Sequence, residues 1–192
     1  MNQIDLFEAV LSESDQQLIE RFQATGRIEA LEILLQRHLV SVRTTVFQMV
    51  LNHDAADDIT QEIFLRVVRG MDRFEGRSEF STWLYRIAMN TTHSYLAKQG
   101  RDKTQAIVDG TETFGLHQPP DGVLMQTELA IEIKIALENL TPSLRAAIVL
   151  VCLQGQTTKD AAKIEGCSTD TMYWRVHEAR RQLKKLLAEH VQ

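Results

Sequence analysis

Aromatic and basic side chains gather between positions 74 and 90 in a combination that can bind unpaired bases. The cluster contains Phe74, Phe80, Trp83, Tyr85, Arg77 and Arg86. Aromatic faces stack on single-stranded bases at about 1–3 kcal/mol per base. Asn90 follows Arg86 by one helical turn, so the two share a face, and an asparagine amide can bind two edges of a base. The alternative is that Phe80, Trp83 and Leu84 belong to the core, and for Trp83 we expect both uses in part.

Residues 157–185 contain a second candidate nucleic-acid site, a helix-turn-helix pattern. We expect a short helix after Thr157 or Thr158, a turn at Gly166-Cys167 and a longer helix that Ser168 caps. The longer helix carries the basic side chains Arg175, Arg180, Arg181, Lys184 and Lys185. A helix of this kind fits the major groove while its cations neutralise phosphates. On the pattern alone, an ordinary helical hairpin with a solvated basic end is the alternative.

An acidic and amide-bearing face is predicted on the helix that contains residues 57–64. Asp58, Gln61 and Glu62 share this face, because residues three and four apart are neighbours on a helix. The apolar side chains of Ile59 and Ile63 point the other way. Such a face is most often simply solvated; the alternative is that it docks on a basic protein surface.

The formal charge is unevenly distributed along the 192 residues, although the whole chain is acidic at −5. Counted by segment, residues 71–103 carry +2 and residues 140–192 carry +3, whereas residues 1–70 and 104–139 carry −5 each. Both basic segments coincide with the candidate nucleic-acid sites. The distribution is typical of a protein with two DNA-facing surfaces and a separate basic protein partner.

Composition and motifs argue against several classes of protein. An apolar content of 44% supports a packed core and argues against global disorder. The histidines are scattered without an HExxH or paired-carboxylate motif, so we expect no metal, no cofactor and no hydrolase activity. Cys152 and Cys167 are expected to be reduced and to pack. The chain shows no signal peptide and no apolar run near the roughly 18 residues of a membrane span, so we expect a cytoplasmic protein without membrane contact of its own.

The periodicity is helical nearly throughout, which predicts an all-α protein. In the first domain, residues 1–99, we expect helices over 14–24, 28–51, 55–72 and from about Ser81 to Gly100. Residues 100–122 contain six glycines and prolines and lack periodicity, so they predict a flexible linker. In the second domain, residues 123–192, we expect a helix over 125–139, another opening at Thr141-Pro142, and the helix-turn-helix.

The motifs resemble those of a known family. DDITQEIFLRVVRGMDRF followed by FSTWLYRIAMNTTHSYLAKQGR resembles sigma region 2 of the extracytoplasmic-function (ECF) type of bacterial RNA polymerase sigma factor. LTPSLRAAIVLVCLQGQTTKDAAKIEGCSTDTMYWRVHEARRQLKKLL resembles sigma region 4. The resemblance covers about 28–100 and 125–190, with the expected linker between them.

The resemblance implies a role for each matching position. Asp58, Gln61 and Glu62 would dock on the clamp coiled coil of the polymerase's largest subunit. The −10 promoter element would be melted and held by Phe74, Gly76, Arg77, Ser78, Phe80, Trp83, Arg86, Ile87, Asn90, Lys98 and Arg101. The −35 element would be contacted by the last helix, through Ser168, Thr171, Tyr173, Trp174, Arg175, Glu178, Arg180 and Arg181. An acidic linker with Asp109, Glu112 and Asp121 would thread toward the active cleft.

The region that resembles the −35 reader departs from the family. Tyr173 and Trp174 stand where the family has Lys or Arg followed by Ser or Thr, and Glu178 stands where it often has Arg. In the region that resembles sigma region 2, which is otherwise nearly standard, Ser94 stands where many members have Asp. Glu178 therefore either accepts a hydrogen bond from a base or pairs with Arg175 or Arg181.

The sequence thus predicts two small helical domains on a flexible linker, with the function of a sigma factor. Its expected partners are core RNA polymerase, promoter DNA and, by analogy with the family, an anti-sigma factor. The alternative is a polymerase-independent helix-turn-helix transcription regulator. Such a regulator would need neither the face at Asp58, Gln61 and Glu62 nor the loop after Phe74.

Overall fold

The computed structural model describes residues 13–108 and 128–190, and every regular element in these two ranges is a helix. This confirms the predicted all-α class. The first domain consists of α2 (Asp15–Thr25), α3 (Ile28–Val50), α4 (His53–Gly70), the 3₁₀ helix η1 (Met71–Arg73) and α5 (Phe80–Val108). None of the described helices is both long and apolar enough to cross a membrane.

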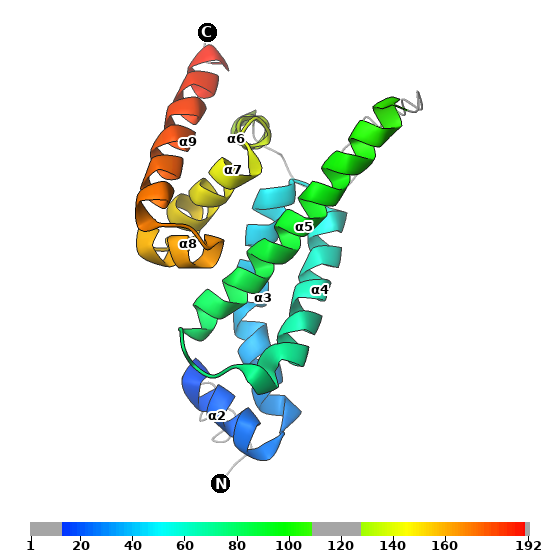
Figure 1. The fold of residues 1–192 in the computed structure, drawn as a ribbon, viewed down its shortest axis with the longest axis vertical. Helices are drawn as coiled ribbons and strands as arrows, with labels where there is room; N and C mark the ends of the chain where they lie inside the picture. The colour runs from blue at the N-terminus through cyan, green and yellow to red at the C-terminus, as the bar shows by residue number, and fades with distance from the viewer. Residues whose placement is uncertain (1–12, 109–127, 191–192) are drawn as a thin grey trace.

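The three long helices of the first domain lie side by side, and α2 packs against the end of the group that contains the start of α3 (Figure 1). The apolar stripes that the sequence predicts meet in one core. Its fully buried members include Leu31 and Leu34 of α3, Ile63 of α4 and Leu84 of α5. Burying a side chain of this size stabilises the fold by about 1.5–3 kcal/mol, so these four contacts hold the three helices together.

Local sequence signals set the helix boundaries of the first domain. Ser14 and Gln17 form a capping box, in which Gln17 N donates to Ser14 Oγ at 3.3 Å and Ser14 N donates to Gln17 Oε1 at 2.7 Å. Asn52 caps α4 by accepting a hydrogen bond from Ala55 N at 2.8 Å. The helix expected from about Ser81 begins one residue earlier, at Phe80, so Ser81 lies inside α5 and does not cap it; Trp83 N donates to Glu79 O.

Helix α5 extends further than the sequence indicated. It continues through Gly100 to Val108, so the first part of the predicted linker is helical. Glycine inside a helix costs only about 1 kcal/mol relative to alanine. The following residues include the good helix formers Arg101, Lys103 and Gln105, which sustain the helix. The rest of the predicted linker, residues 109–122 with its three acidic positions, lies outside the described residues.

The second domain contains the elements α6 (Glu128–Glu138), α7 (Pro142–Ile148), the π-helix η2 (Val149–Leu153), α8 (Thr158–Glu165) and α9 (Thr169–His190). Thr141 caps α7 and is followed by proline at the first helical position, as predicted. Thr157 caps α8 by accepting from Asp160 N at 3.1 Å. The π-helical turn η2 was not foreseen, because its apolar sequence also fits an ordinary α-helix.

The two domains lie against each other rather than apart (Figure 1). Helix α8 packs on α5, while α7 and η2 pack on α3. Two apolar clusters contain residues from both domains: one centres on Met49, Tyr85 and Met89, and the other includes Leu51. The sequence predicted the two domains and did not predict this contact.

Candidate protein and nucleic-acid interfaces

The acidic and amide-bearing face lies on α4 where the sequence predicted it. Asp58 and Gln61 are exposed, and Glu62 is half-buried. Ile59 and Ile63 on the opposite face are buried in the first-domain core. Glu62 accepts a hydrogen bond from Arg66 Nε at 2.7 Å one turn away, so its carboxylate is already partly neutralised. The structure therefore brings the three predicted residues together on one accessible surface.

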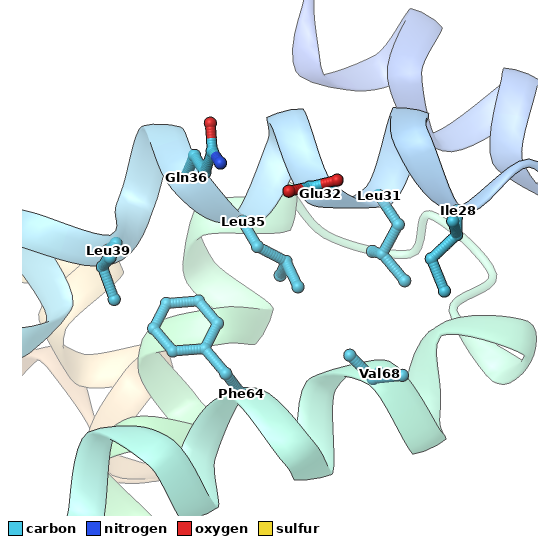
Figure 2. Close-up of a pocket in the computed structure, with 8 residues that line it drawn as sticks. All are labelled: Ile28, Leu31, Glu32, Leu35, Gln36, Leu39, Phe64 and Val68. Atoms are coloured by element: carbon cyan, nitrogen blue, oxygen red, sulfur yellow. The ribbon is translucent and has the colours of Figure 1, made fainter.

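A shallow apolar groove of about 270 Å³ lies between α3 and α4, next to this face. Its lining comprises Ile28, Leu31, Glu32, Leu35, Gln36, Leu39, Phe64 and Val68. Figure 2 shows Phe64 and Val68 of α4 pointing toward the leucines of α3 across the groove. Ile28 is 64% exposed, an unusual fraction for so apolar a side chain. In the sequence, Phe64 and Val68 widen the apolar stripe of α4 beyond the residues that face the core, and these two side chains line the groove.

The loop between η1 and α5 packs on a cluster of aromatic rings. The Phe74 and Trp83 ring centroids are 5.1 Å apart, and Phe80 lies 5.9 Å from both rings. Phe74 and Phe80 are buried in the core, at 7% and 4% exposed, whereas Trp83 is half-buried. The Gln23 amide of α2 also donates to Phe74 O at 2.8 Å. For Phe80 and Trp83, the expectation of a core position is thus met, wholly and in part respectively.

Two glycines shape the same loop. Gly76 adopts a left-handed backbone with φ of 67°, which favours glycine. At Gly70, an added Cβ would lie 3.2 Å from the Trp83 ring. The absence of a side chain at Gly70 therefore lets the indole pack against the last turn of α4 and lie beneath the loop.

On the solvent side of these rings, the exposed groups are polar and charged. A depression of about 310 Å³ is lined by Arg73, Phe74, Glu75, Arg77, Ser78, Trp83 and Arg86. Arg77 is largely exposed and pairs with Glu75 at 2.5 Å. Along α5, Asn90, Lys98 and Arg101 are exposed, and Ile87 is half-buried. The predicted −10 residues therefore divide into buried aromatic supports and an exposed polar rim, with Asn90 about one turn beyond the depression.

Helices α8 and α9 form the predicted helix-turn-helix. The turn contains Gly166, whose φ of 64° ends α8 in the left-handed conformation. Ser168 begins α9 by accepting a hydrogen bond from Thr171 N at 3.1 Å. Tyr173 and Trp174 follow on the solvent side, each 61% exposed. Two large aromatic side chains so exposed at the start of a helix are well placed to contact another molecule.

Glu178 and Arg181 of α9 pair with each other, whereas Arg175 and Arg180 of the same helix contact α8 and η2. Glu178 accepts hydrogen bonds from Arg181 at 2.7 and 2.8 Å and from Gln182 Nε2 at 2.6 Å. These bonds lower the pKa of Glu178 to about 2, so it stays ionised at any physiological pH. The pairing favours the view that Glu178 organises its neighbours. Arg175 contacts Glu165 at 3.3 Å and is mostly buried, and Arg180 Nη2 donates to Cys152 Sγ at 3.3 Å.

His177 was not among the predicted site residues, although α9 exposes it. It lines an open depression of about 480 Å³ with Tyr173, Val176, Arg180, Arg181 and Lys184. The sequence could have indicated His177, because it follows Tyr173 by four residues and so shares a helix face with it. In the described parts of the chain, no group of three or more His, Cys, Asp and Glu side chains is arranged to hold a metal ion.

Comparisons with known proteins agree with this division into two regions. Residues 34–102 match the family model of Sigma-70 region 2, and residues 131–183 match that of Sigma-70 region 4. The ECF RNA polymerase sigma-E factor of Escherichia coli (strain K12) is 34% identical over 175 residues, which cover 87% of this chain and 91% of that protein.

Solved structures share the fold. The sigma factor RpoE in complex with the anti-sigma factor NepR from Bartonella quintana is similar, with a TM-score of 0.66 and 31% identity, over 82% of this chain and 96% of that one. CnrH in complex with the cytosolic domain of CnrY gives a TM-score of 0.69 at 23% identity, over 92% of this chain and 99% of that chain, and so shares the fold. These matches confirm the resemblance seen in the motifs: the chain belongs to the ECF family of RNA polymerase sigma factors.

Proposed function

We propose that this sigma factor docks on core RNA polymerase through α4, opens the −10 promoter element with the loop before α5, and recognises the −35 element with α9. The observation that carries the proposal is the separation of surfaces. The first domain carries two surfaces: an acidic face beside an apolar groove, and a polar loop that packs on aromatic rings. The second domain carries a basic helix-turn-helix.

The α4 face has the composition of a protein-docking surface. Asp58, Gln61 and Glu62 supply a polar rim, and the groove with Phe64 and Val68 supplies an apolar centre. Stable protein interfaces commonly combine a hydrophobic centre with a polar, solvent-accessible rim. A basic amphipathic helical element of the polymerase would satisfy both parts at once, because its cations would meet the carboxylates while its apolar face fills the groove.

The loop before α5 would capture a base that leaves the −10 duplex. Since Phe74 and Phe80 are buried, we assign them to holding the loop, and we assign contact with DNA to Arg77, Arg86 and Asn90. Unpairing and unstacking a base costs on the order of a few kcal/mol, which binding in a preformed pocket offsets. Opening therefore needs no covalent chemistry and no cofactor, and we propose that the chain is not an enzyme.

The start of α9 would enter the major groove at the −35 element. Tyr173 and Trp174 add large aromatic surface where the family has Lys or Arg followed by Ser or Thr, which suits contact with thymine methyl groups. Glu178 would hold Arg181 in place rather than contact a base, because its carboxylate already accepts three hydrogen bonds. Arg180 and Lys184, which line the adjacent depression, would approach phosphates.

Further partners follow from the family. The Bartonella quintana relative is bound to an anti-sigma factor, and we propose that an anti-sigma factor also regulates this chain. Its place of action would be the cytoplasm, where RNA polymerase and promoter DNA are found.

Run-off transcription from genomic DNA tests the proposal and returns the promoter sequence. Purified core polymerase with this chain should produce promoter-specific transcripts, whereas core polymerase alone should not. Gln61→Ala with Glu62→Lys should weaken core binding in a pull-down at least tenfold while leaving the circular dichroism spectrum unchanged. Lys159→Glu, an exposed change on the second domain, is the matched control. Unaltered core binding by the double variant would overturn the docking surface.

A polymerase-independent regulator would behave differently. It would bind a specific duplex by itself at nanomolar concentration and physiological salt. We expect the isolated chain to bind duplex DNA weakly and with strong salt dependence, because its net charge is −5 and its basic residues lie in separate regions. An electrophoretic mobility shift assay with the selected promoter, with and without core polymerase, separates the two functions.

A further inference from the structure

The loop between η1 and α5 is held at its two ends and not along its length. Outside the helices, none of the backbone–backbone hydrogen bonds of the described chain involves residues 75–78. The rings of Phe74 and Phe80, on either side of this stretch, are buried in the first-domain core. The position of the loop therefore depends on what holds these two flanking residues.

Gln23 of α2 holds the first end of the loop. Its Nε2 donates to Phe74 O at 2.8 Å, although the two residues are 51 positions apart in the sequence. The N–H of Phe74 already donates to Met71 O at 3.1 Å, so the bond from Gln23 fixes the other backbone group of the same residue. Phe74 also lines the depression of about 310 Å³ beside the loop. A shift of the Phe74 backbone would thus move one wall of that depression.

The second end of the loop is linked to the same helix through His38 of α3. The His38 and Phe80 ring centroids are 5.4 Å apart, with an edge-to-face angle of 62°. His38 Nε2 lies 2.6 Å from Asp15 Oδ2 in the first turn of α2. Asp15 and Gln23 are separated by about 12 Å along the helix, at 1.5 Å per residue. One short helix thus reaches both ends of the loop with polar side chains.

The position of α2 is itself well determined. An isolated helix of 11 residues is only marginally stable. This one is capped by Ser14 at its start and by Gly26, in the left-handed conformation, at its end. Leu18 and Ile19 anchor it in the first-domain core, at 0% and 2% exposed. The amide of Gln23 therefore reaches the loop from a fixed backbone.

We propose that Gln23 is a positioning residue for promoter opening: through the carbonyl of Phe74, α2 holds the loop in the geometry that captures the flipped −10 base. Gln23 does not line the depression, so it acts through Phe74 and not by touching DNA. This inference rests on the proposed function and deepens it, because it assigns to α2 a part in base capture.

A positioning role and a purely structural role differ in one measurable way. If Gln23 only stabilised the fold, its loss would weaken binding of every −10 sequence alike. If Gln23 positions the capture loop, its loss reduces the contribution of the captured base and leaves the contributions of the other bases unchanged. The test therefore combines variants of the protein with deletions of single bases, as in a double-mutant cycle.

The experiment uses holoenzyme assembled from core polymerase and the full chain. Its affinity is measured by fluorescence anisotropy for a single-stranded oligonucleotide that carries the −10 element of the promoter found by run-off transcription. Each base of the element is replaced in turn with an abasic site. Gln23→Leu removes the donor, and Gln16→Leu is the matched control. The control makes the same change on the same helix, where Gln16 Nε2 donates at 2.8 Å to Glu20 and not to the loop.

We expect the wild-type holoenzyme to lose affinity at least fivefold when the captured base is absent, since a stacked base contributes this much or more. Gln23→Leu should bind the intact oligonucleotide about three- to tenfold more weakly, the usual effect of one hydrogen bond. Its loss of affinity at the captured position should be smaller than the wild-type loss by the same factor. Losses at the other positions, and binding to core polymerase, should stay within twofold of wild type. Gln16→Leu should behave as wild type throughout.

Unchanged affinities for Gln23→Leu, or a weakening that is equal at every position, would overturn the positioning role. A wild-type holoenzyme with no position at which an abasic site matters would instead count against base capture and so against the proposed function. The two failures are therefore distinguishable.

Gln23→Glu provides a second variant that preserves the size and shape of the side chain. A carboxylate accepts hydrogen bonds and cannot donate one to Phe74 O. The added charge acts on the phosphates of every oligonucleotide alike, so it does not alter the comparison between positions. Gln16→Glu controls for the charge. We expect Gln23→Glu to show the same reduced loss at the captured position, and a full wild-type loss there would overturn the proposal.

Discussion

Arg145 offers the sharpest test of how the second domain is held. The residue is 8% exposed, and its guanidinium donates to three backbone carbonyls: Met49 O at 2.5 Å, Glu138 O at 3.1 Å and Leu140 O at 3.4 Å. These carbonyls come from the end of α3, the end of α6 and the connection that follows it. One side chain thus ties the end of α3 in the first domain to the end of α6 and its connection in the second domain.

The expected loss for Arg145→Met follows from these contacts. A hydrogen bond that involves a charged group contributes about 1.5–3 kcal/mol, and the bonds to Met49 O and Glu138 O are short enough to count fully. Removing the guanidinium also relieves a cost of burying its charge. Burial lowers the pKa of the Arg145 guanidinium, and Nε has no hydrogen-bond partner. Methionine retains the apolar stem. We therefore expect a net loss of about 2–4 kcal/mol in the free energy of unfolding, a large part of the roughly 5–15 kcal/mol typical of a folded protein.

Urea unfolding followed by circular dichroism measures this loss. The corresponding fall in Tm is about 6–12 °C if the loss is 3 kcal/mol in a chain of this size. Arg180→Met is the matched control, because Arg180 is exposed and its guanidinium donates to Cys152 Sγ at the surface; we expect a change below about 0.5 kcal/mol. A loss below 1 kcal/mol for Arg145→Met would refute the reasoning, since the carbonyls would then find other partners.

Three further variants test particular contacts. Gly70→Ala should change the free energy of unfolding by less than about 0.5 kcal/mol from wild type. A gain in helix propensity of about 1 kcal/mol is opposed by the 3.2 Å approach of the new Cβ to the Trp83 ring. A red shift of tryptophan emission should report the displaced ring. Arg181→Ala should raise the pKa of Glu178 from about 2 toward 4.5, as measured by carboxyl NMR titration. In the wild type, the stabilisation from this depressed pKa is present above pH 4.5 and is lost as the pH falls through about 2. Trp174→Ala should leave stability nearly unchanged because the side chain is 61% exposed, yet it should reduce transcription at least fivefold if it contacts the −35 element.

Periodicity and caps predicted the helices of both domains within a few residues, for reasons visible in the structure. Apolar residues spaced by three and four, such as Ile59 and Ile63, are buried because one helix face meets the core. Ser168 ends up as a cap because its hydroxyl satisfies a backbone N–H that no helical carbonyl can reach. The prediction was wrong where two signals competed, as at Gly100, because one glycine does not outweigh a following run of helix-forming residues.

For the candidate site, the sequence predicted which residues share a helix face, but it did not predict which side chains of the loop are buried. The sequence placed Asp58, Gln61 and Glu62 on one face, since helical spacing determines a face. It did not separate Phe74, which is buried, from Arg77, which is exposed, because both lie in a loop without periodicity. Only packing against Trp83 and Phe80 decides which loop residue faces inward.

The contact between the domains could not be predicted, because an apolar stripe shows that a face is covered and not what covers it. Met49 and Met89 would look the same in a sequence whether the first domain, the second domain or another protein buried them. The covering surface of the second domain includes the small residues Ala146 and Ala161, which allow a close approach and give little sequence signal.

The first domain thus has two apolar surfaces beyond its own core, and they differ in one respect. The surface around Met49 and Met89 is covered by the second domain, whereas the groove around Leu39 and Val68 is open. A partner that binds the open groove encounters no competition from the second domain, but one that needs the covered part of α5 does. Under the proposed function, docking on polymerase through the open groove and binding of the −10 element along α5 would therefore be separable steps.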